Sequence, residues 1–130
     1  MAVALRKISA ISLFVDDVAR SKAWYQRVFG LPVVYEDENS AVIEFENTVV
    51  NLLARGEANG LIGPAPVARA NGGADAQFSL WIDDVNAACK QLQETGVELI
   101  NGPMDRPWGM RTACFADPDG HNWEIAQNLS

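Results

Sequence analysis

Glu124 is the side chain in this sequence that is best placed to do chemistry. It follows residues 117–120, Asp-Pro-Asp-Gly, whose order is typical of a type I turn. A strand should leave this turn, with Glu124 on the face opposite two large apolar residues. In a dry site the carboxylate would act as a general base, and beside a cationic ligand it would be the counter-charge. A third interpretation is a structural carboxylate, hydrogen-bonded across the sheet by Gln77 or Ser79.

Other groups that resemble catalytic residues fit structural roles better. His121, the single histidine, directly follows the turn glycine, and we assign it to the turn. Asp117 and Asp119 lack the spacing of a calcium-binding EF-hand loop, so we expect them only to form the turn. Arg111 has the strand parity of the apolar positions, which favours a salt bridge at a surface or an interface. These assignments leave Glu124 as the candidate catalytic residue, should the protein be an enzyme.

The elements that position Glu124 come in two similar sets. Phe-Val-Asp-Asp-Val at 14–18 returns as Trp-Ile-Asp-Asp-Val at 81–85, each time where a strand should meet a helix. The acid pairs are expected to cap these helices, which end at Gly30 and Gly96. Hydrophobic periodicity predicts β-α-β-β-β in each set. The expected strands are 8–15, 31–36, 41–46 and 49–53 in the first set, and 77–82, 97–100, 110–116 and 122–127 in the second.

The fold class is therefore α+β, with two tandem βαβββ modules at about 6–55 and 74–128 in a single domain spanning 1–130. Residues 56–73 are rich in Gly, Pro and Ala and have little periodicity, so we interpret them as a linker. Residues 101–109 are expected to form a long irregular loop. Trp108 in this loop would either cover a ligand or pack at the rim of a site.

The first strand of each module has one chemically unusual face. Its aliphatic side should pack under the helix of its own module, while the other side presents small, polar and aromatic groups. These are Ala10, Ser12 and Phe14 in the first module, and Gln77, Ser79 and Trp81 in the second. Two such faces placed toward each other would enclose a pocket into which Glu124 points. Phe14 and Trp81 would then either form walls for a flat ligand or fill an apolar interface.

Composition limits the classes of partner. The 130 residues are 48% hydrophobic, as in a globular protein, and carry a formal net charge of -7. This charge argues against nucleic acids and anionic membranes as partners. The N-terminal segment is typical neither of a signal peptide nor of a membrane span. Cys89 and Cys114 have no neighbouring metal or redox motif, which favours a reducing cytoplasm.

The two βαβββ sets, the strand-Asp-Asp-Val-helix junctions and the closing run 110–121 with Glu124 after it resemble the vicinal oxygen chelate superfamily. That group includes glyoxalase I, methylmalonyl-CoA epimerase, extradiol dioxygenases, fosfomycin resistance enzymes and bleomycin-binding resistance proteins. The resemblance covers about residues 8–127. It implies a cup-shaped mixed β-sheet with helices on its outer face, commonly in a homodimer. In the enzymes of this group, a divalent metal lies in the cup.

The resemblance places the metal-ligand positions of the superfamily on Ala10, Asn51, Gln77 and Glu124. Ala10 has no donor atom, and Asn51 and Gln77 offer only neutral carbonyl oxygens, so Glu124 is the sole anionic ligand. A catalytic zinc or iron normally has three good nitrogen, sulfur or carboxylate ligands. We therefore expect no metal cofactor. The alternative is one weakly bound divalent metal at Gln77 and Glu124.

The leading hypothesis is a metal-independent small-molecule binding protein of the glyoxalase/bleomycin-resistance type, which holds a flat, neutral or cationic ligand such as an antibiotic. The alternative is a lyase or isomerase of glyoxalase or epimerase type with Glu124 as general base. The identity of the ligand does not follow from the residues. The expected ligand-binding residues are Ser12, Phe14, Asn51, Gln77, Ser79, Trp81, Trp108, Thr112 and Glu124.

Overall fold

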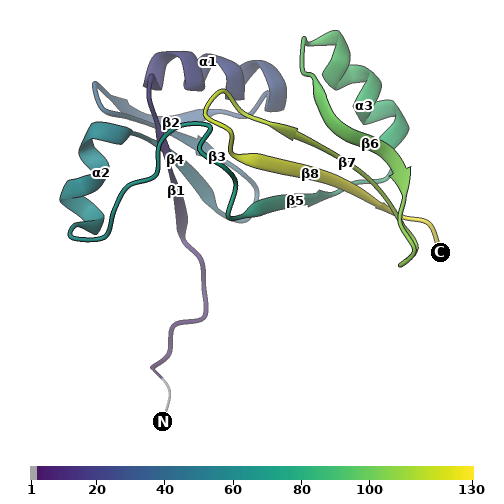
Figure 1. The fold of residues 1–130 in the computed structure, drawn as a ribbon, viewed down its shortest axis with the longest axis horizontal. Coiled ribbons are helices and arrows are strands. Elements are labelled where there is room, and N and C mark those ends of the chain that lie inside the picture. The colour runs from purple at the N-terminus through teal and green to yellow at the C-terminus, as the bar shows by residue number, and fades with distance from the viewer. Residues whose placement is uncertain (1–2) are drawn as a thin grey trace. The chain divides into compact units, whose positions relative to one another are not determined.

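The computed structural model describes residues 3–130, which form three helices and eight strands (Figure 1). The chain divides into two compact units between Val67 and Ala68. None of the helices in the described range is long and apolar enough to cross a membrane.

The first unit is a four-stranded mixed sheet with helices beside it. The strand order is β1-β4-β3-β2, in which β1 and β4 are parallel and the other neighbours are antiparallel. Its elements are β1 (Ala10–Val15), α1 (Val18–Phe29), β2 (Val33–Asp37), β3 (Ser40–Glu44), β4 (Val49–Ala54) and α2 (Arg55–Ile62).

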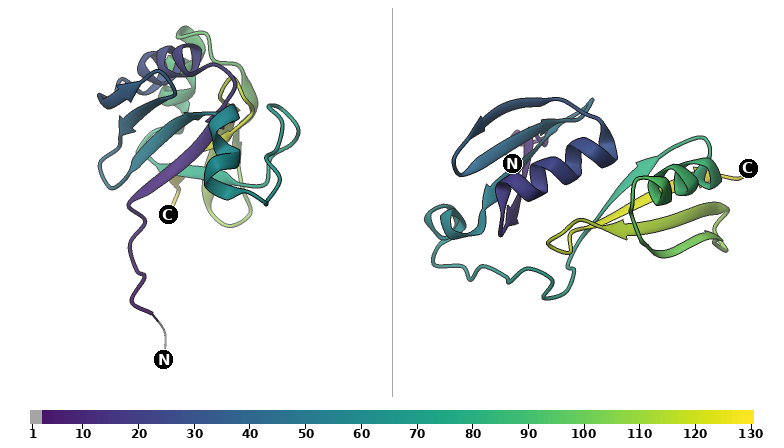
Figure 2. Two further views of the ribbon diagram at one scale, coloured as in Figure 1. Left: turned by 90° about the vertical axis from the view of Figure 1, so that its left-hand side faces the viewer. Right: turned by 90° about the horizontal axis from the view of Figure 1, so that it is seen from above.

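The second unit repeats this arrangement. The strand order is β5-β8-β7-β6, with β5 and β8 parallel. Its elements are β5 (Gln77–Trp81), α3 (Val85–Glu94), β6 (Leu99–Asp105), β7 (Met110–Ala116) and β8 (Asn122–Asn128). In each unit one helix lies along one face of its own sheet, α1 in the first and α3 in the second (Figure 2). The α+β class and the tandem βαβββ modules predicted from the sequence are confirmed.

The two repeated helices begin at the predicted caps. The Asp17 side chain accepts a hydrogen bond from the Arg20 N–H at 3.0 Å, and Asp84 accepts one from the Ala87 N–H at the same distance. Each side chain satisfies a backbone donor that the helix itself leaves without a partner. The α1 helix ends at Gly30, whose φ of 64° allows its N–H to close the last turn.

The helix-covered face of each sheet is the apolar core. On the open face of the second sheet, Thr112, Cys114 and Ala126 are buried as well. The buried side chains of the helix-covered face alternate along the strands, as the sequence pattern predicted. In the first unit they are Leu13, Val15, Ala41, Ile43, Val50 and Leu52, and in the second Ala113, Phe115, Trp123 and Ile125. The opposite face of each sheet therefore carries the small, polar and aromatic groups.

Two expectations were wrong. Residues 56–62 were predicted to belong to an irregular linker at 56–73 but form most of α2, an eight-residue helix that contains two glycines and has no side-chain N-cap. The loop predicted at 101–109 is largely strand, because β6 runs from Leu99 to Asp105. Two register shifts in β6, between Leu99 and Asn101 and between Asn101 and Met104, break its alternation. Gly102, within the second shift, has a φ of 90°. Bulges of this kind remove the period-2 signal by which a strand is found in sequence.

Candidate functional site

The open face of the second sheet forms a hollow of about 400 Å³. Register explains its composition: Ser79 pairs with Glu124 across β5 and β8, and Ala126 lies between Trp81 and Thr112. We call it the Trp81/Trp108 hollow, and its lining residues are Ser79, Trp81, Trp108, Met110, Thr112, Glu124 and Ala126.

A tight hairpin loop between β6 and β7 positions Trp108. The Gly109 N–H donates to the Arg106 carbonyl at 3.0 Å, and the Arg106 N–H donates to the Met110 carbonyl at 2.7 Å. Pro107 lies at the second position of this turn, and Gly109 has a φ of 83°. These features match a type I turn followed by a left-handed residue, a common hairpin connection. Trp108 is therefore presented by a defined turn rather than by a long flexible loop.

Two tryptophans of the hollow are strongly exposed. Trp81 is 78% exposed and Trp108 is 68% exposed. By contrast, Trp123 on the helix-covered face is buried, and its ring lies 5.1 Å from that of Phe78. Large aromatic surfaces gathered at one hollow are typical of ligand-binding sites and are costly to leave in water.

Glu124 supplies the negative charge of the hollow. Its Oε1 accepts a hydrogen bond from the Ser79 hydroxyl at 2.8 Å, as the structural interpretation of Glu124 expected. Within residues 3–130 this is the single hydrogen bond to the carboxylate, so Oε2 keeps its acceptor capacity.

Cys114 lies opposite Glu124 on β7, and burial is the main cause that raises the pKa of its thiol. The thiol is therefore protonated at neutral pH.

The predicted site residues do not all belong to this hollow. Gln77 is exposed on β5, on the same face but outside the lining. Three further predicted site residues, Ser12, Phe14 and Asn51, lie on the first sheet. There the Asn51 amide donates to the Ser12 hydroxyl at 3.4 Å, and Asn51 Oδ1 is buried without a partner among the described residues. The Phe14 carbonyl accepts a hydrogen bond from Arg55 at 2.9 Å.

Sequence reasoning missed three residues of this region. Met110 and Ala126 line the hollow, and Arg106 donates from Nε to the Thr112 hydroxyl at 2.9 Å. Met110 and Ala126 could have been found, because they share strand parity with Thr112 and Glu124 respectively. Arg106 gave no such signal, since it lies in a turn where parity has no meaning.

The first unit has a hollow of its own, about 350 Å³ in volume, around Asp37. The Asp37 carboxylate already accepts hydrogen bonds from the Asn39 N–H, the Tyr35 hydroxyl and the Ser40 hydroxyl. The Asn39 bond is the largest cause that lowers the pKa of Asp37, followed by those from Tyr35 and Ser40. A carboxylate with three donors has little remaining capacity for a ligand, so this hollow is the weaker candidate.

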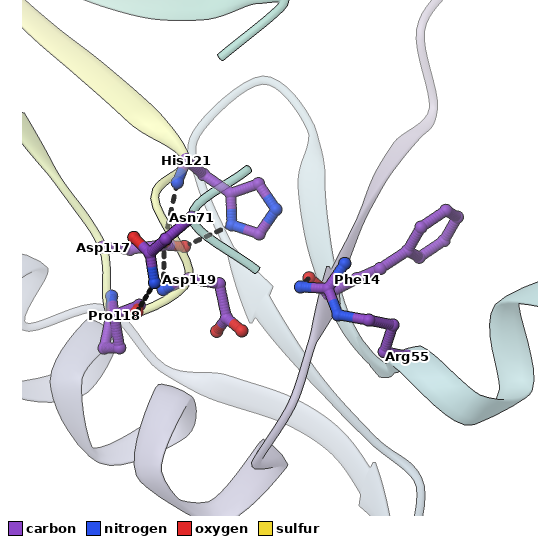
Figure 3. A network of polar contacts seen from close by, with 7 residues as sticks. All are labelled: Phe14, Arg55, Asn71, Asp117, Pro118, Asp119 and His121. Atoms are coloured by element: carbon purple, nitrogen blue, oxygen red, sulfur yellow. Dashed lines mark hydrogen bonds and ion pairs between the residues drawn. The ribbon is translucent and has the colours of Figure 1, made fainter. Parts of the chain in front are cut away.

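The turn before β8 is held by a buried network (Figure 3). Asp117 Oδ1 accepts from the N–H groups of Asp119 at 3.0 Å and His121 at 2.9 Å, and its Oδ2 lies 2.7 Å from His121 Nδ1. Asn71 donates its backbone N–H to Asp119 and its amide to the carbonyl of Pro118. His121 thus belongs to the turn, and Arg111 forms the expected salt bridge, with Asp105 at 2.7 Å.

Asp117→Asn is expected to destabilise the protein by about 1–2 kcal/mol, because an amide has one acceptor oxygen where the carboxyl group uses both of its oxygens in three hydrogen bonds. Urea unfolding would measure the loss. Asp75→Asn, at an exposed position, is the control and should change stability by less than about 0.5 kcal/mol. Equal stability of the two variants would show that the Asp117 network does not hold the turn.

The lining of the Trp81/Trp108 hollow does not by itself supply the ligands of a catalytic metal. Within the described part of the chain, no three His, Cys, Asp or Glu side chains are grouped so that they could hold an ion. The hollow offers one carboxylate and two hydroxyl groups, which falls short of the ligand sets of zinc and iron.

Comparisons with known proteins agree on one group. The sequence model of the Glyoxalase/Bleomycin resistance protein/Dioxygenase superfamily matches residues 7–125. The uncharacterized protein YraH of Bacillus subtilis (strain 168) is 32% identical over 128 residues, which cover 95% of this chain and 99% of YraH.

Solved structures show the same fold. A glyoxalase/bleomycin resistance protein/dioxygenase from Nocardioides has a TM-score of 0.88 at 21% identity, over 99% of this chain and 87% of its own. TnmS3, an antibiotic binding protein from Streptomyces sp. CB03234, has a TM-score of 0.73 at 26% identity, over 98% and 99% of the two chains.

Proposed function

The chain belongs to the Glyoxalase/Bleomycin resistance protein/Dioxygenase superfamily, and we propose that it is a metal-independent protein that binds a flat, neutral or cationic small molecule. The superfamily relationship confirms the resemblance seen in the sequence. The observation that carries the proposal is the Trp81/Trp108 hollow, where two exposed tryptophans and a carboxylate with a free acceptor oxygen line one space.

The chemistry of this hollow supports a flat ligand. An aromatic molecule between exposed indole rings removes apolar surface from water on both partners. A cationic group adds attraction to the ring faces and to Glu124. The volume of about 400 Å³ is within the range of small-molecule sites. An antibiotic is one ligand class of this kind, and the similarity to the antibiotic binding protein TnmS3 supports it.

The alternative is an enzyme in which Glu124 is a general base, and the free Oε2 of Glu124 is the observation in its favour. Proton transfer also needs a second group that returns the proton to the product. Among the lining residues, Glu124 is the one with an acidic side chain, and the hydroxyl groups of Ser79 and Thr112 are weak donors. Binding without turnover therefore remains the proposal.

Glu124→Gln is expected to weaken binding of 4-methylbenzylamine, a flat cationic probe, by about tenfold, because the counter-charge is lost. Isothermal titration calorimetry would measure the affinity. The uncharged analogue 4-methylbenzyl alcohol should bind both proteins alike. Glu98→Gln, at an exposed position in the same unit, is the control for net charge.

The fold should tolerate this change, because the amide can still accept the Ser79 hydrogen bond. Thermal unfolding would check this. Loss of folding in Glu124→Gln would show that the carboxylate is structural, and unchanged amine affinity in a folded variant would remove Glu124 from the site.

The proposed setting is a reducing cytoplasm, in which Cys89 and Cys114 remain the free, buried thiols of the structure. We also propose a homodimer, which light scattering on the purified protein would test. Nucleic acids and membranes are not among the proposed partners, because the net charge of -7 would repel both.

A further inference from the structure

Arg106 is a fixed cation beside the Trp81/Trp108 hollow. Its Nε donates to the hydroxyl of Thr112, a buried residue that lines the hollow. Its guanidinium carbon lies 5.8 Å from the centre of the Trp108 ring. The tight turn at 106–109 holds the backbone of both residues through two hydrogen bonds. The guanidinium is therefore oriented before any ligand binds.

The charge of Arg106 is not neutralised by a neighbouring acid in the described chain. The adjacent acid, Asp105, is bound by Arg111, with contacts of 2.7 and 3.3 Å from two guanidinium nitrogens. The hydrogen bonds of Arg106 involve its Nε and its backbone, so both terminal nitrogens keep their donors. A partly buried guanidinium with free, planar donors is suited to a carboxylate or a phosphate.

The Arg106 side chain contacts Thr112, which lies on the same sheet face as Glu124. Thr112, which holds Arg106, pairs with Ala126, while Glu124 pairs with Cys114. Thr112 and Glu124 are thus diagonal neighbours, at a spacing of roughly 7–8 Å. Burial is the largest cause that raises the pKa of the Cys114 thiol, and a backbone hydrogen bond with Asn101 lowers it; after these, the charge of Glu124 raises this pKa and that of Arg106 lowers it. No ion pair joins the two charges in the described residues.

Glu124 lines the hollow, and Arg106 lies beside it in contact with the lining residues Thr112 and Trp108, without an ion pair between the two charges in the described residues. This arrangement points to a ligand that carries the complement of each charge. We propose that Arg106 binds an anionic group of the ligand, and that the ligand is a flat amphoteric molecule with its carboxylate or phosphate at Arg106 and its cationic or donor group at Glu124. The aromatic body between them would lie against Trp81 and Trp108. This inference rests on the proposed binding function and extends it, because a simple cation would leave Arg106 without a partner.

Three probes with one ring test the inference by calorimetry. These are 4-(aminomethyl)benzoate, with opposite charges at the two ends of the ring, 4-methylbenzylamine, with the cation alone, and 4-methylbenzoate, with the anion alone. The protein should bind the amphoteric probe about tenfold more tightly than the amine, because it adds a charge-assisted pair. Arg106→Gln should remove this preference and should not weaken binding of the amine.

Further variants separate the role of Arg106 from general effects. Arg106→Lys should retain part of the preference, because an ammonium group keeps the charge but not the planar fork. Arg111→Gln is the matched control, since Arg111 is paired with Asp105 on the other face of the sheet, and it should keep the full preference. Glu124→Gln should weaken binding of the amine. Binding of 4-methylbenzoate should stay unchanged or become tighter.

The outcomes distinguish this inference from the proposed function. If the amine binds at the hollow and the amphoteric probe binds no better, Arg106 is not an anion site and the binding function stands. The same conclusion follows if folded Arg106→Gln keeps the preference. If none of the three probes binds at the hollow, the proposed function fails and the inference fails with it.

Discussion

Trp81→Ala is expected to weaken binding of 4-methylbenzylamine by about tenfold to thirtyfold, because stacking on one aromatic side chain contributes about 1–3 kcal/mol. The double variant Trp81→Ala/Trp108→Ala should lose measurable binding. Both rings are mostly exposed, at 78% and 68%, so their removal should leave stability almost unchanged. Calorimetry on the folded variants measures the effect.

Conservative and remote substitutions serve as controls for the tryptophan variants. Trp81→Phe should retain part of the affinity, because phenylalanine still offers a flat face. Leu61→Ala removes an equally exposed apolar side chain, 67% exposed, from the hollow around Asp37 in the first unit. It should bind the amine as the unaltered protein does. Full affinity in the double tryptophan variant would mean that the two rings do not form the site.

Gly102→Ala should destabilise the protein by about 3–4 kcal/mol, because it combines a left-handed backbone with a steric overlap. Gly102 has a φ of 90°. A Cβ atom there would overlap the carbonyl oxygen of Thr112 and lie 2.6 Å from the Cα of Ala113. Both contacts are with the backbone of β7, which a rotamer change cannot relieve. Urea unfolding would give the loss in the free energy of unfolding.

Gly96→Ala separates the two causes of this loss. Gly96 has a similar φ of 87°, but a Cβ atom added there would meet nothing within 4 Å. The substitution should therefore cost only about 1–2 kcal/mol, the effect of the backbone conformation alone. If the two variants were equally stable, the close approach of β6 to β7 at Gly102 would be wrong.

The helices α1 and α3 and most strands could be predicted because their signals are local. Asp17 and Asp84 are capping residues directly before apolar helical stripes, and the alternation around Glu124 identifies β8 and its two faces. The hydrogen bond from Ser79 to Glu124 across β5 and β8 agrees with the structural interpretation of Glu124, in which Gln77 or Ser79 donates to it across the sheet. Four residues that line one hollow lie on strands identified from local signals, namely Ser79, Trp81, Thr112 and Glu124, whereas Trp108 was assigned to a predicted loop.

What could not be predicted depends on contacts between distant or irregular segments. The alternation of β6 is broken by its two register shifts, so the path of this strand and the turn that carries Arg106 were not visible. The α2 helix contains two glycines and buries mainly Ala58, which leaves no amphipathic pattern to detect. Strand parity placed Ser12, Phe14 and Asn51 on the first sheet, and parity identifies only the face of a sheet and not which hollow a residue lines.

The most direct test of the central claim is a nuclear magnetic resonance titration of isotope-labelled protein with 4-methylbenzylamine. Binding at the Trp81/Trp108 hollow should shift the indole N–H signals of Trp81 and Trp108 and the backbone signals of Ser79, Thr112 and Ala126. The signals of Asn39, Ser40 and Leu61, around the hollow of the first unit, should not move. Shifts confined to those first-unit residues, or no shifts near the two tryptophans, would contradict the account.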